Sequence, residues 1–182
     1  MAERLPTGLE GLVLVEPAVH GDPRGFLVET FRDDEWAALG AAGPFVQHNQ
    51  SRSAIGTLRG IHFQTMPGQA KLVRCARGRI FDVAVDLRRD SPTFGRWEGH
   101  ELDDQRHRQL FVPVGFGHGF CVLSEEADVC YLLTSLYDAR TEAGIAWDDP
   151  EVGIEWPLQE PLLSERDRQA PSLSEVTETL PW

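Results

Sequence analysis

Hydrophobic and polar positions of this chain alternate over short stretches, which is the period of a β-strand with one buried face. About eight such stretches are rich in β-branched or aromatic residues, and turn-forming residues separate them. They span residues 11–16, 25–31, 58–64, 71–75, 79–87, 109–112, 119–123 and 129–136. The pattern therefore predicts an all-β protein.

Helical periodicity is scarce. Only residues 33–39 predict a short helix, which we expect to stop before Gly43 and Pro44. A further helix start is indicated by Ser164, followed three residues later by Asp167, an arrangement similar to a capping box. The proline-containing region 150–182 is expected to wrap over the outside of the strands.

The chain has 182 residues, enough for one domain with a substantial core, and we expect a single domain over residues 1–182. Strands at this spacing favour a β-sandwich or a barrel. Closure into a double-sheet jelly roll would protect the edge strands. A cupin-type jelly-roll barrel with a few short helices is the resulting fold prediction.

The chain is acidic, with 29 acidic and 17 basic residues and a formal charge of -12. This balance argues against general binding to nucleic acids or anionic membranes, so a local arginine cluster must hold any anionic ligand. The N-terminus lacks a secretory pattern, and no apolar run reaches the ~20 residues of a membrane span. We expect a cytoplasmic protein. Three cysteines without CxxC spacing, Cys75, Cys121 and Cys130, are expected to be buried free thiols.

Strand alternation groups the residues that can carry chemistry. His62 and Gln64 share one face of a strand, and Lys71 shares a face with Val73 and Cys75. Lys71 is the only lysine of the chain. Lysine is a compact, movable cation that can sit beside a single developing oxyanion, whereas arginine is a rigid fork. The pattern therefore indicates a chemical role for Lys71.

Two further strands carry polar side chains on one face. Asp82 and Asp86 face away from the apolar residues that alternate with them. Tyr131 and Leu133 share another face, with the residues between and beside them, Cys130 and Leu132, on the opposite one.

Short motifs connect these residues to a known family. His62-x-Gln64 and Pro113-x-Gly115-x-x-His118 resemble the two motifs of the cupin superfamily. A longer ordered series comprises Gly21-Asp22-x-Arg24-Gly25-Phe26, Gln47-x-Asn49-x-Ser51-x-Ser53, Arg59-Gly60-x-His62-x-Gln64, Lys71-Leu72-Val73, Asp82-Val83-x-Val85-Asp86, Ser91-Pro92-Thr93-Phe94-Gly95, Gly115-Phe116-x-His118-Gly119-Phe120, Asp149-Pro150, Trp156-Pro157 and Leu163-Ser164-x-x-Asp167. From about Gly8 to Pro171, this series resembles the dTDP-4-dehydrorhamnose 3,5-epimerase family.

The resemblance implies a homodimeric enzyme without a metal or cofactor that acts on a dTDP-4-keto-6-deoxyhexose. A ketone at C4 acidifies the hydrogens at C3 and C5. A base can remove one of them, and the resulting enolate is reprotonated from the opposite face. This chemistry needs a base, an acid and a group that stabilises the oxyanion.

The resemblance also assigns catalytic roles. It implies that His62 is the proton acceptor, with Asp167 as the carboxylate that orients it. On the residues alone, Asp82 is the rival partner of His62. Tyr131 matches the proton donor, a phenol that stays protonated until an enolate needs its proton. Lys71 would stabilise the enolate oxygen.

Substrate-binding positions follow from the same resemblance. They are Arg24, Glu29, Gln47, Asn49, Arg59, His118, Glu142 and Arg166. Arg24 and Glu29 are expected to reach across a dimer interface, and arginines suit a pyrophosphate because their fork donates two hydrogen bonds. Strict alternation would put Arg59 opposite His62, so its use requires a bulge near Gly60.

The chain also departs from the family pattern. Leu136 and Leu132 replace an aromatic residue and a lysine, and His48 replaces an acidic one. An aromatic residue at 136 would shape the sugar pocket, so an enzyme that inverts only C3 or only C5 is the first alternative. A metal-dependent cupin oxygenase using His62, Gln64 and His118 is disfavoured because Gln64 stands where a histidine is usual and no glutamate follows at the usual short interval. A non-catalytic sugar-binding cupin is the third alternative.

Overall fold

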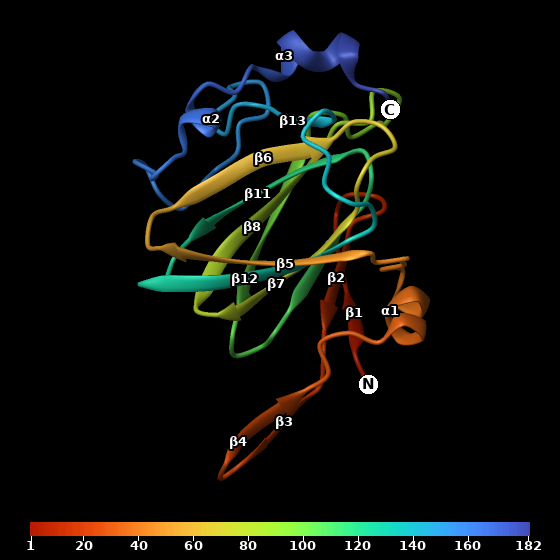
Figure 1. The fold of residues 1–182 in the computed structure, drawn as a ribbon, viewed down its shortest axis with the longest axis vertical. Helices are drawn as coiled ribbons and strands as arrows, with labels where there is room; N and C mark the ends of the chain where they lie inside the picture. Colours follow the sequence, from red (N-terminus) through yellow and green to blue (C-terminus); the bar gives the residue numbers. More distant parts are fainter.

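In the computed structural model, which describes residues 1–182, two antiparallel sheets face each other (Figure 1). The six-stranded sheet has the order β1 (Glu3–Leu5), β2 (Val13–Glu16), β10 (Gln109–Val112), β7 (Lys71–Arg77), β12 (Glu126–Leu133) and β5 (Gln47–Ala54). The five-stranded sheet has the order β13 (Glu142–Gly144), β6 (Leu58–Gln64), β11 (Phe116–Val122), β8 (Arg79–Asp86) and β9 (Trp97–Asp103). Most neighbouring strands come from distant parts of the chain, although β1 pairs with β2 and β8 with β9. The predicted double-sheet β-fold is confirmed.

One part of the space between the sheets is apolar. Val73 and Cys75 of β7 pack there with Ile80 and Ala84 of β8. The predicted alternation is thus confirmed for β7, because Lys71 lies on the same face at the end of the apolar cluster and borders a cavity. The three cysteines are free and buried, as predicted.

The outer face of the five-stranded sheet is also buried. Val83 and Val85 of β8 pack there against Leu173 and Leu180 of the C-terminal region. This region contains α2 (Glu165–Arg168), α3 (Leu173–Val176) and a 3₁₀ helix, η1 (Thr177–Thr179), which lie over β6 in Figure 1. The C-terminal region thus packs on the outer face of this sheet.

Helix α1 (Asp33–Leu39) covers part of the outer face of the six-stranded sheet. Trp36, the one buried residue of this helix, packs there with Val13 and Leu72. The predicted helix is confirmed, and Gly40 ends it in the left-handed conformation, with φ of 102°. None of the helices is long and apolar enough to cross a membrane.

A hairpin formed by β3 (Val19–Asp22) and β4 (Gly25–Val28) projects away from both sheets (Figure 1). The predicted strand 25–31 is therefore wrong at its end, because residues 29–31 leave the strand. Phe26 and Leu27 of this hairpin are 60% and 72% exposed. Their apolar side chains produced the strand pattern although no core covers them here.

The structure has thirteen strands rather than about eight. The sequence QHNQSRSA of β5 shows no apolar alternation, because β5 is an edge strand bordering a polar cavity. The strand predicted at 129–136 is β12, shifted to Glu126–Leu133, and the strand predicted at 119–123 already begins at Phe116. In both strands, polar or glycine residues take part in the ladder and hide the hydrophobic signal.

Candidate active site

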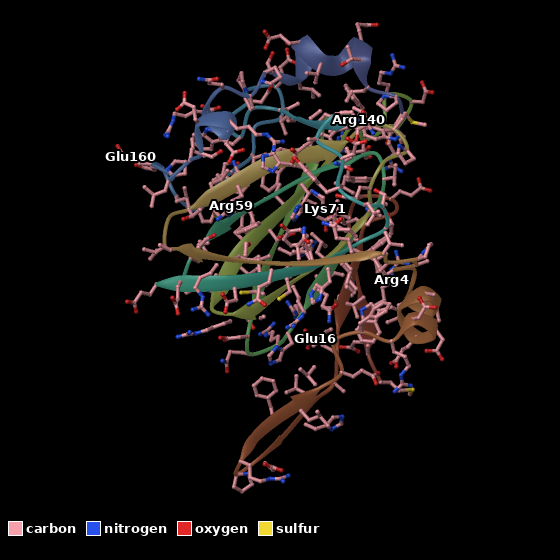
Figure 2. The ribbon with its side chains drawn as sticks, viewed as in Figure 1. Arg4, Glu16, Arg59, Lys71, Arg140 and Glu160 are labelled. Carbon is pink, nitrogen blue, oxygen red and sulfur yellow. The ribbon has the colours of Figure 1, made fainter.

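A cavity of about 690 Å³ lies between the two sheets and is closed on one side by the C-terminal region. Both sheets and the segment from Leu162 to Asp167 contribute to its wall. All the predicted site residues except Arg24 and Glu29 line it; they are His62, Lys71, Tyr131, Asp167, Gln47, Asn49, Arg59, His118, Glu142 and Arg166. Figure 2 shows Arg59 and Lys71 between the layers of the barrel. The acidic chain thus gathers cationic groups at one internal site.

His62 and Asp167 form a close pair in this cavity. Nε2 of His62 lies 2.6 Å from Oδ1 of Asp167. Asp167 belongs to α2, where its backbone N–H donates to Oγ of Ser164 at 3.1 Å. Asp167 therefore lies at the predicted helix start and also pairs with His62. Asp82 is not the partner of His62.

The Asp167 carboxyl group is held in its charged form. Burial acts to raise its pKa, but the hydrogen bond to His62 and the contribution of Ser164 outweigh burial and lower the pKa overall. A charged carboxylate accepts the N–H of Nε2, which leaves the lone pair of the neutral imidazole on Nδ1. The pair can therefore accept a proton at Nδ1 and stabilise the imidazolium that results.

A bulge in β6 brings Arg59 to the same cavity as His62. His62 is opposite His118, and Arg59 is opposite Phe120, so β6 contains one residue more than β11 between these pairs. Gly60 permits the bulge because its φ is +147° and a Cβ atom would lie 2.6 Å from the Cα of Gly119. The bulge required by the use of Arg59 is present.

Lys71 enters the cavity from β7 and is half-buried. Its Nζ donates to the carbonyl oxygen of His62 at 3.4 Å. Burial lowers the pKa of this amine to about 8, and the charges of Asp82 and Glu142 oppose that decrease. At neutral pH the amine is mostly charged, and it lacks the full hydration of a surface lysine.

His118 contacts the buried carboxylate of Asp82. Its Nε2 lies 3.1 Å and 3.0 Å from the two carboxylate oxygens. Burial lowers the pKa of His118 despite the opposing charge of Asp82. A second histidine–aspartate pair thus lies beside the first, because His118 and His62 are cross-strand neighbours.

Tyr131 faces the cavity from the opposite sheet. It lies on β12, opposite Asn49 of β5 and Val73 of β7. His62 belongs to the five-stranded sheet, so a ligand in the cavity has an imidazole on one side and a phenol on the other.

A polar network borders the cavity near Glu142. Arg166 forms an ion pair with Glu142 at 2.7 Å, and the hydroxyl of Tyr137 donates to Glu142 at 2.6 Å. Burial acts to raise the pKa of Glu142, but these two partners lower it overall. The backbone N–H of Tyr137 also donates to Gln47, whose amide donates to Asn49. Tyr137 lines the cavity, although the sequence did not predict it as a site residue. It follows the end of β12, where strand alternation does not predict which way a side chain points.

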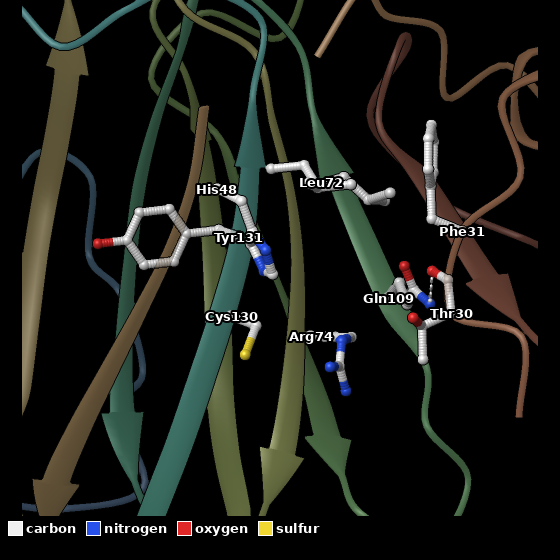
Figure 3. A pocket seen from close by; sticks show the side chains of 9 residues that line it. Thr30, Phe31, His48, Leu72, Arg74, Gln109, Cys130 and Tyr131 are labelled. Atoms are coloured by element: carbon white, nitrogen blue, oxygen red, sulfur yellow. Dashed lines mark hydrogen bonds between the residues drawn. The ribbon is translucent and has the colours of Figure 1, made fainter. Parts of the chain in front are cut away.

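Leu136 lies away from the central cavity, and its effect on which carbon is inverted stays a prediction. Its side chain is 68% exposed and does not line the cavity. The other departures, Leu132 and His48, line a smaller cleft of about 220 Å³ instead. Figure 3 shows that Cys130 and Arg74 border this cleft, whereas the ring of Tyr131 points to the other side of β12. The departures therefore leave the wall of the central cavity intact.

Arg24 and Glu29 lie outside the central cavity. Arg24 stands between β3 and β4 at the end of the projecting hairpin and pairs with Asp22. Glu29 follows β4 and pairs with Arg32 at 2.9 Å. Within one chain, neither residue contacts the other predicted site residues.

The three ligands required by the metal-cupin alternative do not form a site. Gln64 does not line the cavity, and its amide donates to the carbonyl oxygen of Asp138 at 3.0 Å. His62 and His118 each direct Nε2 at an aspartate. No group of three or more histidine, cysteine, aspartate or glutamate residues is arranged to hold a metal ion.

Comparisons with known proteins agree with this geometry. A family model described as dTDP-4-dehydrorhamnose 3,5-epimerase matches residues 6–175. The chain is 50% identical to the dTDP-4-dehydrorhamnose 3,5-epimerase of Pseudomonas aeruginosa over 91% of this chain and 92% of that protein. It is 47% identical to a dTDP-4-dehydrorhamnose 3-epimerase of Streptomyces niveus, over 94% of this chain and 84% of that protein. The crystal structure of the 3,5-epimerase from Legionella pneumophila in complex with dTDP-4-keto-L-rhamnose superposes with a TM-score of 0.96 at 42% identity, covering 100% of this chain and 98% of that one.

Proposed function

This chain belongs to the dTDP-4-dehydrorhamnose 3,5-epimerase family, and we propose that it is an isomerase that epimerises a dTDP-4-keto-6-deoxyhexose in deoxysugar biosynthesis. The observation that carries the proposal is the placement of a histidine–aspartate pair and a tyrosine on opposite walls of one cavity, with a lysine beside them. Inversion of a carbon requires a base on one face and an acid on the other, and these groups meet that requirement.

In the proposed reaction, Nδ1 of His62 takes the hydrogen next to the C4 ketone, and the electron pair moves to the C4 oxygen. Asp167 stabilises the imidazolium formed. The ammonium of Lys71 stabilises the enolate oxygen. The phenol of Tyr131 then returns a proton to the opposite face of the same carbon, and the ketone forms again.

Binding of the nucleotide part is assigned to the remaining polar residues. Arg59 and Arg166 supply positive charge for the pyrophosphate, with His118, Gln47, Asn49 and Glu142 as further contacts. The chain as a whole is strongly acidic, so these local cations are needed to attract an anionic sugar nucleotide.

We further propose that two copies of the chain form a homodimer in which Arg24 and Glu29 complete the neighbouring site. Both residues lie on or beside the projecting hairpin, away from their own cavity. Its exposed Phe26 and Leu27 offer apolar surface for a partner chain. A solution mass of twice 20.3 kDa, measured by light scattering, would support the dimer. A single-domain organisation and a cytoplasmic location stay predictions.

Exchange of hydrogen for deuterium tests the function. The protein is incubated with dTDP-4-keto-6-deoxyglucose in deuterated water, and the signals of C3 and C5 are followed by proton NMR. Deuterium at both carbons supports the double epimerase. Deuterium at one carbon indicates a mono-epimerase, the kind of activity named for the Streptomyces niveus relative. Tight binding without exchange would contradict the catalytic proposal and favour a sugar-binding protein.

The same assay tests the catalytic groups. His62→Ala and Tyr131→Phe are each expected to lower turnover by about 10²–10⁴-fold, the usual contribution of a general base or acid. Binding of dTDP and the circular dichroism spectrum should stay close to those of the wild type. Near-normal turnover in either variant would remove that residue from the mechanism.

A further inference from the structure

Arg59 is the one arginine of the central cavity that no carboxylate holds. Arg166, the other arginine in the cavity wall, is paired with Glu142 at 2.7 Å, so part of its charge is already balanced. Arg59 borders the same cavity from β6 and forms no ion pair (Figure 2). Its positive charge is therefore available to an anionic ligand.

A serine holds the guanidinium of Arg59 where an acid would be usual. Nε of Arg59 donates to Oγ of Ser53 at 3.1 Å, and this is the one side-chain hydrogen bond that either residue makes. Ser53 lies on β5 and is 6% exposed. Because β5 and β6 belong to different sheets, this hydrogen bond joins the two sheets beside the cavity.

Arg52, next to Ser53 in the sequence, shows the alternative arrangement. Its guanidinium makes two hydrogen bonds to Asp128, at 2.7 Å and 2.6 Å. A carboxylate of this kind orients a guanidinium but balances its charge and occupies a terminal nitrogen. The hydroxyl of Ser53 is neutral and occupies only Nε, so both terminal nitrogens of Arg59 stay free.

An anchor matters at Arg59 because this residue is exposed. An arginine side chain has large rotamer freedom, and a ligand that orders it loses part of the binding free energy. The hydrogen bond at Nε removes some of that freedom before a ligand arrives. The two terminal nitrogens can then donate to two phosphate oxygens at a lower entropic cost.

We propose that Ser53 is a positioning residue that orients Arg59 toward the pyrophosphate without neutralising it. The inference rests on the proposed function, in which Arg59 binds the pyrophosphate of a sugar nucleotide. Ser53 does not line the cavity, so it acts through Arg59 and not on the ligand itself. Loss of its hydroxyl should weaken binding of a diphosphate and leave the contacts of the nucleoside unchanged.

Titrations with dTDP and with thymidine test the inference, the first by calorimetry and the second by NMR. Ser53→Ala should lower the affinity for dTDP about fivefold, the net weight of one hydrogen bond, and change that for thymidine less than about twofold. Ser51→Ala is the matched control, because Ser51 lies on the same face of β5, its buried hydroxyl has no hydrogen-bond partner and it does not line the cavity. It should keep both wild-type affinities. An unchanged dTDP affinity in Ser53→Ala, or equal losses for the two ligands, would overturn the inference.

A double-mutant cycle separates orientation of Arg59 from any other effect of the serine. Arg59→Ala should weaken dTDP binding more than Ser53→Ala does, because it removes the charge together with its orientation. Adding Ser53→Ala to Arg59→Ala should cause no further loss. A loss of about fivefold in both backgrounds would show that the serine acts independently of Arg59, contrary to the inference.

Two further substitutions test the hydroxyl and its neutrality. Ser53→Thr retains a hydroxyl and suits a strand, so it should bind dTDP within about twofold of the wild type. Ser53→Asp gives Nε a stronger acceptor but brings a negative charge, so it should bind dTDP more weakly than Ser53→Ala. Wild-type affinity in Ser53→Asp would refute the need for a neutral anchor. Folded Ser53→Thr that binds no better than Ser53→Ala would refute the role of the hydroxyl.

Deuterium exchange separates this inference from the proposed function. With an active wild type, kcat/KM of Ser53→Ala should fall about fivefold, mainly through a higher KM. Wild-type protein that binds dTDP without exchanging hydrogen would refute the proposed reaction, while the dTDP titrations would still decide whether Ser53 orients Arg59. Wild-type protein that does not bind dTDP would overturn both.

Discussion

The two histidine–aspartate pairs of the cavity have the same chemistry and different surroundings. In the first pair, the side chains of His62 and Asp167 are 26% and 4% exposed. In the second, those of His118 and Asp82 are 8% and 0% exposed. The first aspartate comes from a helix of the C-terminal region, whereas the second is part of the sheet itself.

This difference in exposure decides which of the two pairs can exchange a proton with a ligand. A base must meet its substrate and release its proton again, and the more open His62 meets this need. His118 is enclosed, and burial lowers its pKa, so it favours the neutral form. Solvent access, rather than residue type, therefore suits the first pair to proton transfer, whereas the second pair is a hydrogen bond closed off from solvent.

The largest effect is expected from a substitution that breaks the enclosed pair, His118 and Asp82. His118→Leu removes the hydrogen-bond donor of Asp82 and keeps water out, so we expect the free energy of unfolding to fall by about 3 kcal/mol, as for one partner lost from a buried pair. Urea denaturation measures this. His62→Leu is the matched variant and should lose about 1 kcal/mol or less, because water in the cavity can solvate Asp167. Equal losses would show that the two pairs do not differ in burial energetics.

The next largest effect is expected from a substitution that removes the charge of the open pair, His62 and Asp167, and keeps the size of the side chain. Asp167→Asn should lower turnover by about 10²-fold, at the lower end of what a base contributes. An amide carries no charge to stabilise the imidazolium, and if it donates to Nε2 it moves the imidazole proton to Nδ1. Binding of dTDP should not change. Turnover within a fewfold of wild type would contradict the orienting role.

The same variant has an effect on stability against pH. The pKa of Asp167 is lowered in the folded state, so its stabilising contribution is present above the unfolded value of about 3.9 and is lost as the pH falls through the folded value. Urea midpoints from about pH 6 down to about pH 3 should therefore decrease less steeply in Asp167→Asn than in the wild type.

Alternation predicted the parts of the fold where one face of a strand is apolar. It placed Lys71 beside Val73 and Cys75, and the structure confirms this arrangement. It failed for β5, whose side chains border a polar cavity and therefore carry no hydrophobic signal. It also could not tell that the apolar face of β8 points outward, beneath the C-terminal region, while Asp82 points into the barrel.

Site residues were predicted through motifs more than through pattern. The need for a bulge at Gly60 followed from placing Arg59 and His62 in one site, and the register confirms it. The pairing of His118 with Asp82 was missed, because cross-strand contacts depend on strand order and register, which a single sequence does not reveal. The strand predicted at 129–136 was wrong at its end, since Leu136 lies beyond the last residue of β12 and alternation no longer applies there.

The smallest effect is expected from a substitution of the residue that caps α2, the helix carrying Asp167. Ser164 caps α2 through the backbone N–H of Asp167, so Ser164→Ala should destabilise the protein by about 1 kcal/mol and lower turnover about threefold by loosening Asp167. Ser172→Ala is the control, because Ser172 caps α3 away from the cavity, and Glu175 bonds its backbone N–H at 2.7 Å. It should lose similar stability and no activity. If both variants keep full turnover, the helix cap does not position the carboxylate of Asp167. The burial of Asp167 would then be sufficient to hold this carboxylate in place.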